Sequence, residues 1–334
     1  MRLKKINPND YLYASARVRM LRNKIVTMGK LYQIIDAHNL RQAFRVLNTS
    51  GIGVGEEPEN YEAALVRELT ETYNIVREIT DGLVLFDVFR YGYDGLNIKI
   101  ALKAMTAGHD PMPAMTGLGT VPKEEIIDGI NENNISGLPP EMVIAAEEAR
   151  TALALTGDPQ KADILIDKAM LAAMYRIVHE YDNAFFQRVV RSKIDIENIR
   201  SLVRIKRAGN NVKFLDSVLS KGGYIESKKL VEVFSRGIHD IAAFIGNTQY
   251  GPALERAFDG LEAGGRLMHF EKMCDNFMLT FISEANRVVF GVEPILGYIL
   301  EKENEITAVR MVMASKITNI PANTIIERLR EYAR

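Results

Sequence analysis

Few stretches of this 334-residue sequence combine residue types that could do chemistry. The glycine-rich segment "GIGVGEE", residues 51–57, is of the kind that binds phosphate, because backbone amides in such loops cradle phosphate oxygens. It lacks the Gly-Lys-Ser/Thr that completes a P-loop, and it follows a predicted helix rather than a strand. We therefore interpret it as an ordinary loop.

Histidine and cysteine are the usual zinc ligands, but their spacing here does not fit a zinc site. The segment "HFEKMC", residues 269–274, has a histidine, an acid and a thiol, yet no Pro-Cys-x-x-Cys follows to complete a deaminase centre. His179 and Glu180 do not begin a His-Glu-x-x-His motif, because residue 183 is asparagine. The other histidines have no neighbour at metal-ligand spacing: His38, His109 and His239. We predict no catalytic residue, no metal site and no cofactor.

Composition and charge exclude several classes of protein. The sequence is 47% hydrophobic and 25% charged, which is typical of a soluble globular protein. Its formal net charge of −1 gives no electrostatic basis for nucleic-acid binding. The single cysteine, Cys274, excludes an internal disulfide and fits a reducing cytoplasm. We find neither the apolar core of a secretory signal after the basic N-terminal residues nor a run long enough for a transmembrane helix.

The distribution of proline predicts an all-α fold. Proline is absent between Pro159 and Pro252, and the residues between them are rich in alanine, leucine, lysine and glutamate. Proline inside a helix costs about 3 kcal/mol, so a long proline-free stretch of good helix formers favours helices. Alternating strand patterns bounded by hairpin turns are missing.

One helical pattern occurs three times, at intervals of about a hundred residues. Each copy starts at an acid, Asp94, Asp195 or Glu305, a residue type suited to a helix N-terminus. Apolar residues follow four, seven and eight positions later, which is the spacing of one buried helical stripe. These residues are Ile98, Ala101 and Leu102, then Ile199, Leu202 and Val203, and finally Val309, Val312 and Met313.

The three copies also share a predicted end. Fourteen positions after each acid stand Gly108, Gly209 and Asn319, the residue types that best adopt the left-handed conformation that closes a helix. A second similarity links "LRQAFRVLNTSGIG" with "IHDIAAFIGNTQYG", which we expect to end helices near Ser50 and Tyr250. Intervals this long do not fit tetratricopeptide, ankyrin or HEAT repeats. We predict three helical units instead, covering residues 1–120, 121–222 and 223–334.

Each copy carries a basic residue five positions after the acid: Lys99, Arg200 and Arg310. One interpretation is a threefold set of charges that faces a central partner. The other is a solvated helix position, where most lysines and arginines lie, and we favour it on that ground. The three residues are retained as candidate partner-facing positions.

Four segments carry a resemblance to a known family. They are "YLYASARVRMLRNKIV", "DAHNLRQAFRVLNTSGIG", "NIRSLVRIK" and "ITAVRMVMASKITNIPANTIIERLREYAR". Together they resemble the C subunit of archaeal and bacterial A/V-type ATPases, a relative of the d subunit of the eukaryotic V-ATPase. The resemblance runs from end to end and rests on the order of helix faces rather than on one sharp motif. One departure is Ala308 in the third copy, where the others have Asn97 and Asn198, which puts in doubt a functional role for the asparagine.

The resemblance implies a funnel-shaped, all-helical protein with three similar helical units around a pseudo-threefold axis. It implies a non-catalytic rotor subunit of the central stalk, peripheral on the cytoplasmic face of the cell membrane. Its partners would be the subunits of the membrane rotor ring, the D and F subunits of the central shaft, and other ATPase subunits. The complex would couple ATP synthesis or hydrolysis to proton or sodium transport. We expect the isolated chain to be a monomer, because its interfaces serve other subunits.

Two other functions remain open on the sequence alone. A stand-alone α-helical scaffold that binds other soluble proteins would also be repetitive and free of catalytic motifs. Co-isolation with a membrane rotor ring would distinguish it from a rotary ATPase subunit. An all-α enzyme with a diffuse site is disfavoured by the missing metal and phosphate motifs.

Overall fold

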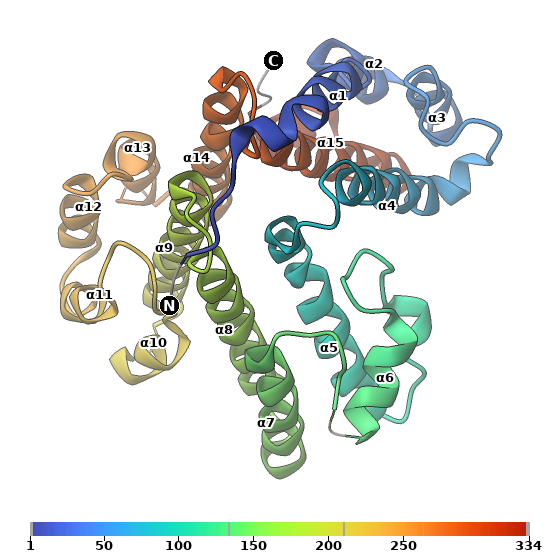
Figure 1. Ribbon diagram of the computed structural model, residues 1–334. Coiled ribbons are helices and arrows are strands. Elements are labelled where there is room, and N and C mark those ends of the chain that lie inside the picture. The colour runs from blue at the N-terminus through green and yellow to red at the C-terminus, as the bar shows by residue number, and fades with distance from the viewer. Residues whose placement is uncertain (1–2, 133, 210, 263, 332–334) are drawn as a thin grey trace. The chain divides into compact units, whose positions relative to one another are not determined.

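The structure, a computed structural model, describes residues 3–132, 134–209, 211–262 and 264–331. These residues form sixteen α-helices and four short 3-10 helices (Figure 1). Within the described ranges there is no β-strand, only an isolated bridge between Lys4 and Tyr181. The all-α prediction is confirmed.

The chain divides into two compact units, and each is described by itself. Unit 1 consists of Met1–Ile6 and Leu83–Ser235. Its elements are η3 (Val84–Phe89), α5 (Tyr91–Thr106), η4 (Met112–Ala114), α6 (Lys123–Glu132), α7 (Pro140–Thr156), α8 (Pro159–Val178), α9 (Ala184–Arg207), α10 (Val212–Val218) and α11 (Ser227–Phe234). Helices α7 and α8 form a hairpin that turns at Gly157, whose left-handed backbone (φ 64°) suits glycine (Figure 1). Helix α8 also packs against α5 and α9.

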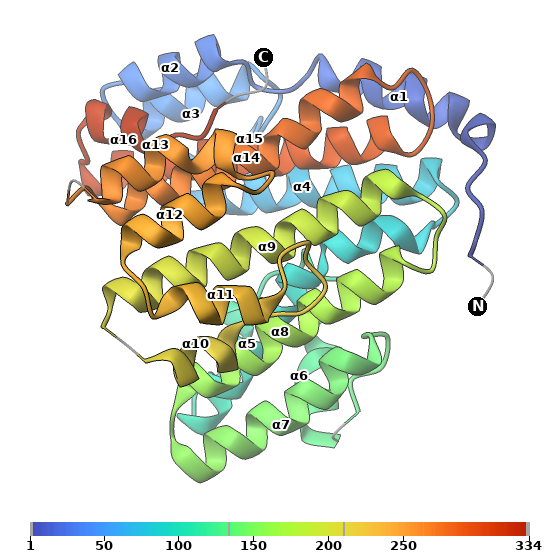
Figure 2. The same ribbon diagram turned by 90° about the vertical axis from the view of Figure 1, so that its left-hand side faces the viewer.

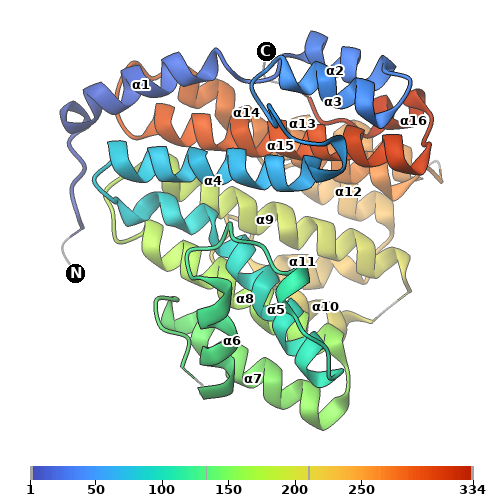
Figure 3. The ribbon, with the colours of Figure 1, turned by 90° about the vertical axis from the view of Figure 1, so that its right-hand side faces the viewer.

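Unit 2 consists of Asn7–Gly82 and Arg236–Arg334. Its elements are η1 (Pro8–Tyr11), α1 (Leu12–Arg22), α2 (Met28–Asp36), α3 (Leu40–Asn48), η2 (Pro58–Asn60), α4 (Tyr61–Ile79), α12 (Ile238–Gly246), α13 (Gly251–Glu262), α14 (Leu267–Arg287), α15 (Glu293–Thr318) and α16 (Ala322–Arg328). Helix α15 is its central element, because it packs against α1, α2, α3, α4, α14 and α16. Figure 3 shows α15 between α1 and α4, and these helices run side by side.

The three copies of the repeated pattern lie on α5, α9 and α15. All nine residues of the predicted stripes are buried. The predicted ends are also correct, since the three residues there have left-handed backbones, with φ of 73° at Gly108, 71° at Gly209 and 53° at Asn319. Apolar spacing and helix termination were therefore readable from the sequence.

The predicted start of the pattern is wrong for two copies. Helix α9 begins at Ala184 and α15 at Glu293, so Asp195 and Glu305 lie well inside their helices. The side chain of Asn183 caps α9 by accepting a hydrogen bond from the amide of Phe186. Asp94 lies in the first turn of α5, but it does not cap the helix. All three carboxylates are completely buried, and they bond to loops instead.

Candidate functional site

The buried carboxylate of Asp94 holds the loop that joins α5 to α6. Asp94 accepts hydrogen bonds from the backbone amides of Thr120 (2.8 Å) and Val121 (3.2 Å) and from the Thr120 hydroxyl (2.7 Å). Burial raises the pKa of Asp94, and these hydrogen bonds partly oppose that rise. Gly119 is required here, because a Cβ at that position would overlap Oδ1 of Asp94. We call this arrangement of a buried carboxylate and loop amides the first loop anchor.

Asp195 makes the second loop anchor in the same way. It accepts hydrogen bonds from the amides of Tyr224 (2.6 Å) and Ile225 (3.1 Å), in the loop before α11. A Cβ on Gly223 would overlap Oδ1 of Asp195. Hydrogen bonds to an ionised acceptor contribute about 1.5–3 kcal/mol each, so both loops are held firmly on their helices.

An arginine four positions before each aspartate binds the same loop. Arg90 donates to the carbonyls of Leu118 (3.0 Å) and Gly119. Arg191 donates to the carbonyls of Gly222 (3.3 Å) and Gly223 (3.1 Å). In each copy the arginine thus binds backbone carbonyls, and the aspartate binds backbone amides, of the same short loop.

An asparagine three positions after each aspartate completes the set. Asn97 donates to the carbonyl of Thr116 (2.8 Å) and accepts from its amide (2.9 Å). Asn198 makes the same pair of bonds to Ser220, both 2.8 Å. Arginine, aspartate and asparagine at positions i, i+4 and i+7 share one helix face, so a single face clamps the whole loop. The asparagine therefore has a structural role in two copies.

The third loop anchor, on α15, uses different chemistry. Glu305 accepts a 2.7 Å hydrogen bond from the amide of Val26, in the loop between α1 and α2. At the position of the arginine stands Glu301, which accepts from Arg22 Nε (2.6 Å) and Nη2 (3.3 Å). In the other copies this helix position holds an arginine that binds loop carbonyls, whereas here it holds an acid that pairs with an arginine at the end of α1. Ala308 replaces the asparagine.

A buried lysine supports the third anchor. Lys302, only 2% exposed, lies 2.7 Å from Glu305 and 2.5 Å from Glu68 of α4. Burial opposes its charge, but attraction to Glu305 and Glu68 raises the pKa of Lys302 on balance. The lysine is therefore held in its charged form between two carboxylates.

The helix that follows each anchored loop repeats as well. Five, eight and nine positions after Val121, Ile225 and Val26 the structure buries Ile126, Gly129 and Ile130 on α6, Leu230, Val233 and Phe234 on α11, and Leu31, Ile34 and Ile35 on α2. The loop after α1 and helix α2 therefore pack against α15 in the same way as the loop before α6 and helix α6 pack against α5, and the loop before α11 and helix α11 pack against α9. This relationship was not predicted, although "TVPKEEIIDGI", "YIESKKLVEVF" and "IVTMGKLYQII" show the shared spacing.

The three candidate basic positions are half-buried and paired with acids inside their own units. Lys99 lies 2.7 Å from Asp167, Arg200 lies 3.0 Å from Glu197, and Arg310 lies 2.8 Å from Glu62. Such partly exposed pairs contribute about 0–1 kcal/mol each to stability. They stand at matching positions of α5, α9 and α15, but their acidic partners lie on α8, on α9 itself and on α4.

The segments that suggested chemistry have structural explanations. Residues 51–57 form turns, with left-handed backbones at Gly51, Gly53 and Gly55. Cys274 is buried on α14. Among the residues that the structure describes, no group of three or more His, Cys, Asp or Glu side chains is placed to hold a metal ion.

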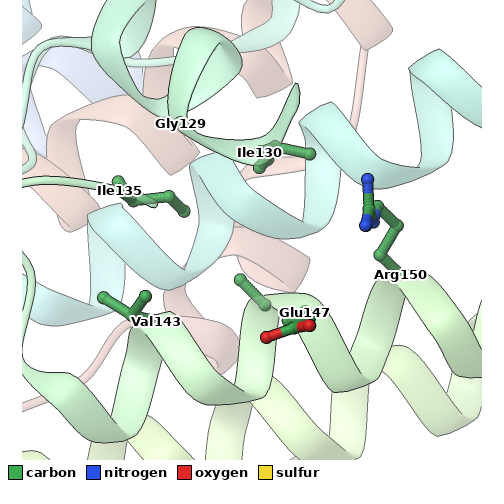
Figure 4. A pocket seen from close by; sticks show the side chains of 7 residues that line it. Gly129, Ile130, Ile135, Val143, Glu147 and Arg150 are labelled. Atoms are coloured by element: carbon green, nitrogen blue, oxygen red, sulfur yellow. The ribbon is translucent and has the colours of Figure 1, made fainter. Parts of the chain in front are cut away.

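Two cavities in unit 1 also lack the features of a catalytic site. One of about 270 Å³ is lined by Lys4, Arg176 and Glu180 among others, and these charges pair with one another: Glu180 lies 3.0 Å from Lys4 and 2.6 Å from Arg176. The other, of about 10 Å³, lies between α6 and α7 (Figure 4). It has room for little more than a water molecule, and Ile130, Ile135 and Val143 are among the residues that line it.

Across the described ranges, no helix combines the length and apolar character needed to span a bilayer.

Comparison with known proteins gives a consistent result. The family described as ATP synthase (C/AC39) subunit matches residues 14–328. The C subunit of the A-type ATP synthase of Methanocaldococcus jannaschii is 24% identical over 94% of this chain and 85% of its own length. That of Thermococcus gammatolerans is 26% identical over 90% of this chain and 84% of its own. The C subunit of the V-type sodium ATPase of Enterococcus hirae is 20% identical over 82% of this chain and 83% of its own.

Proposed function

Since this chain belongs to the ATP synthase (C/AC39) subunit family, we propose that it is a central-stalk rotor subunit that couples a membrane rotor ring to a central shaft. It is a non-catalytic subunit of an A/V-type ATP synthase complex. In the proposed role it passes torque between ion transport through the ring, of protons or sodium ions, and ATP synthesis or hydrolysis elsewhere in the complex.

The proposed partners are the subunits of the membrane rotor ring on one side and the D and F subunits of the shaft on the other. The proposed location is peripheral, on the cytoplasmic face of the cell membrane. Isolated from these partners, the chain is expected to be a monomer. We also keep the division into three helical units, residues 1–120, 121–222 and 223–334, around a pseudo-threefold axis as part of the proposal.

The family match over residues 14–328 carries this proposal, and the three loop anchors support it. A protein that transmits torque must resist sliding of its loops along its helices. Each anchor fixes one loop to one long helix through a buried carboxylate, and leaving a buried hydrogen-bonding group of such a contact unsatisfied costs about 1–3 kcal/mol. The presence of an anchor in each of the three copies is compatible with a rigid coupling element.

The experiment that tests the proposal is binding to the rotor ring. Purified chain is mixed with a purified ring in detergent, and co-migration is measured by size-exclusion chromatography. We expect a stable complex. A chain that fails to bind the ring, yet binds other soluble proteins, would contradict the rotor role and favour a stand-alone helical scaffold.

Lys99, Arg200 and Arg310 remain the candidate partner-facing positions. If they contact a partner, replacing all three by alanine weakens binding to the ring or the shaft by more than about tenfold while the melting temperature changes little. Unchanged binding would leave them as helix positions paired with internal acids.

A further inference from the structure

Helix α1 and the loop that follows α14 expose large apolar side chains. Tyr13 is 71% exposed and Met20 is 68% exposed, and Leu12 on the same helix is also exposed. Val289, at 64%, and Phe290 are exposed in the loop. We call these five residues the α1 face.

The α1 face is continuous, because the loop after α14 is bonded along α1. The hydroxyl of Ser15 accepts a hydrogen bond from the amide of Gly291 (3.0 Å), and Arg19 donates to the carbonyl of Val288 (2.9 Å). Figure 2 shows this loop beside α1, at the end of α14. Val289 and Phe290 therefore lie next to the exposed side of the helix.

The other side of α1 is already used. Ala14, Val18 and Leu21 are buried in unit 2, where α1 packs on α15 and α4. Tyr13, Arg17 and Met20, at i, i+4 and i+7, point away from that core along one exposed strip. The exposed tyrosine and methionine are thus not explained by packing within unit 2.

Several basic residues around the α1 face have no ion-pair partner among the described residues. Arg17, Arg19, Lys24 and Arg287 are exposed, and none of them forms an ion pair with a carboxylate in the described part of the chain. Helix α1 itself contains no acidic residue. The nearby acids are Asp10 in η1, which accepts a hydrogen bond from Asn7, and the partly buried Glu293, whose carboxylate lies close to Gly291 of the loop. A chain with a net charge of −1 has here a local positive surface that is mixed with apolar side chains.

We propose that the α1 face docks on an anionic lipid surface. Exposed arginines beside tyrosine, methionine, leucine and phenylalanine have the composition of helices that lie at a bilayer interface. Arg17 and Arg19 meet anionic headgroups, while the apolar side chains enter the boundary between headgroups and acyl chains. The positive surface selects against neutral lipid.

This contact goes beyond the proposed rotor function, which needs only protein neighbours. It is tested with the purified full chain and vesicles, without any other protein, so its failure does not bear on ring binding. Co-sedimentation is measured with vesicles of phosphatidylcholine alone and with about 30% phosphatidylglycerol, at low and at high salt.

Wild-type chain is expected to bind the anionic vesicles and to be released by salt. Arg17→Glu/Arg19→Glu should lower the partition coefficient by at least about tenfold, because four units of charge are changed. Phe290→Ser should lower it at low salt without a change of net charge, because it removes apolar contact. The control is Arg41→Glu/Arg45→Glu on α3, which makes the same change of charge at two other exposed arginines and should retain most binding.

Several results would overturn the proposal. They are no binding of wild-type chain to anionic vesicles, equal binding to neutral vesicles, and an equal loss of binding in the α3 control. Binding to a purified ring that requires Arg17 and Arg19, without binding to vesicles, would assign the face to an acidic protein partner instead. Circular dichroism of each variant confirms that a loss is not caused by unfolding.

Discussion

Glu305 on α15 accepts a 2.7 Å hydrogen bond from the backbone amide of Val26, and the two residues are 279 positions apart in the chain. The corresponding bonds of Asp94 and Asp195 reach loops only 26–30 positions further along. The third copy of the repeat is therefore completed by the segment that follows α1. Unit 2 joins early and late parts of the chain through this contact.

Removing the second anchor should destabilise unit 1. Asp195→Ala leaves the amides of Tyr224 and Ile225 without their acceptor, so the free energy of unfolding should fall by about 2–4 kcal/mol in urea denaturation. Glu148→Ala, which removes an exposed carboxylate from α7, serves as the control and should change it by less than about 0.5 kcal/mol. Equal effects of the two substitutions would show that the anchor does not stabilise the fold.

Two nearby glycines provide a matched pair for the first anchor. Gly119→Ala places a methyl group against Oδ1 of Asp94 and should cost about 1–3 kcal/mol of unfolding free energy. Gly117→Ala meets no atom within 4 Å and should be nearly neutral. Thermal melts of both variants give the comparison. A Gly119→Ala variant as stable as Gly117→Ala would contradict the close approach of loop and carboxylate.

The buried lysine of the third anchor should be essential for unit 2. Lys302→Met leaves Glu305 buried without its cation, and we expect a loss of about 3–5 kcal/mol in the free energy of unfolding. Lys24→Met changes the same residue type at an exposed position and should have little effect. If the two substitutions had similar effects, the ion pair would not be a major stabilising contact.

From the pKa of Lys302 we predict that the stability of unit 2 depends on pH. Because the pKa of Lys302 is raised in the folded state, its stabilising contribution is complete below the unfolded value, about 10.4, and is lost as the pH rises through the folded pKa. The stability difference between wild type and Lys302→Met should therefore shrink above about pH 10. Parallel stability curves up to about pH 11 and beyond would contradict the raised pKa.

The buried stripe can be tested at Val203, which is completely buried on α9. Val203→Asp places a charge in this apolar environment and should unfold unit 1 or cost more than about 4 kcal/mol. Val212→Asp, at a position that is 39% exposed, is the control. Unchanged helicity and melting of Val203→Asp would show that the buried face of α9 is assigned incorrectly.

The stripes and the helix ends were predictable because they depend on local rules. Apolar residues such as Ile199 and Val309 follow helical spacing, and Gly108 and Gly209 adopt the backbone that their residue type permits. The role of Asp195 was not predictable from its own segment. Its partners lie in a distant loop, and an acid near a helix start also fits a cap.

A signal for the anchors was nevertheless present in the sequence. Arginine four positions before the aspartate and asparagine three after it recur in the first two copies, on one helix face. The third copy has Glu301 and Ala308 at these positions, and its arginine, Arg22, comes from another helix. In the first two copies the helix arginine binds loop carbonyls, whereas in the third a helix glutamate binds an arginine, so the similarity that a sequence comparison detects is lost.

Binding to the shaft is the most direct test of the rotor role. The purified chain is mixed at micromolar concentration with a purified pair of the D and F shaft subunits, and the mass of the product is measured by size-exclusion chromatography with light scattering. We expect a single species that contains one copy of the chain and one D–F pair. Separate elution of the chain as an unbound monomer would contradict the coupling of ring to shaft by this protein.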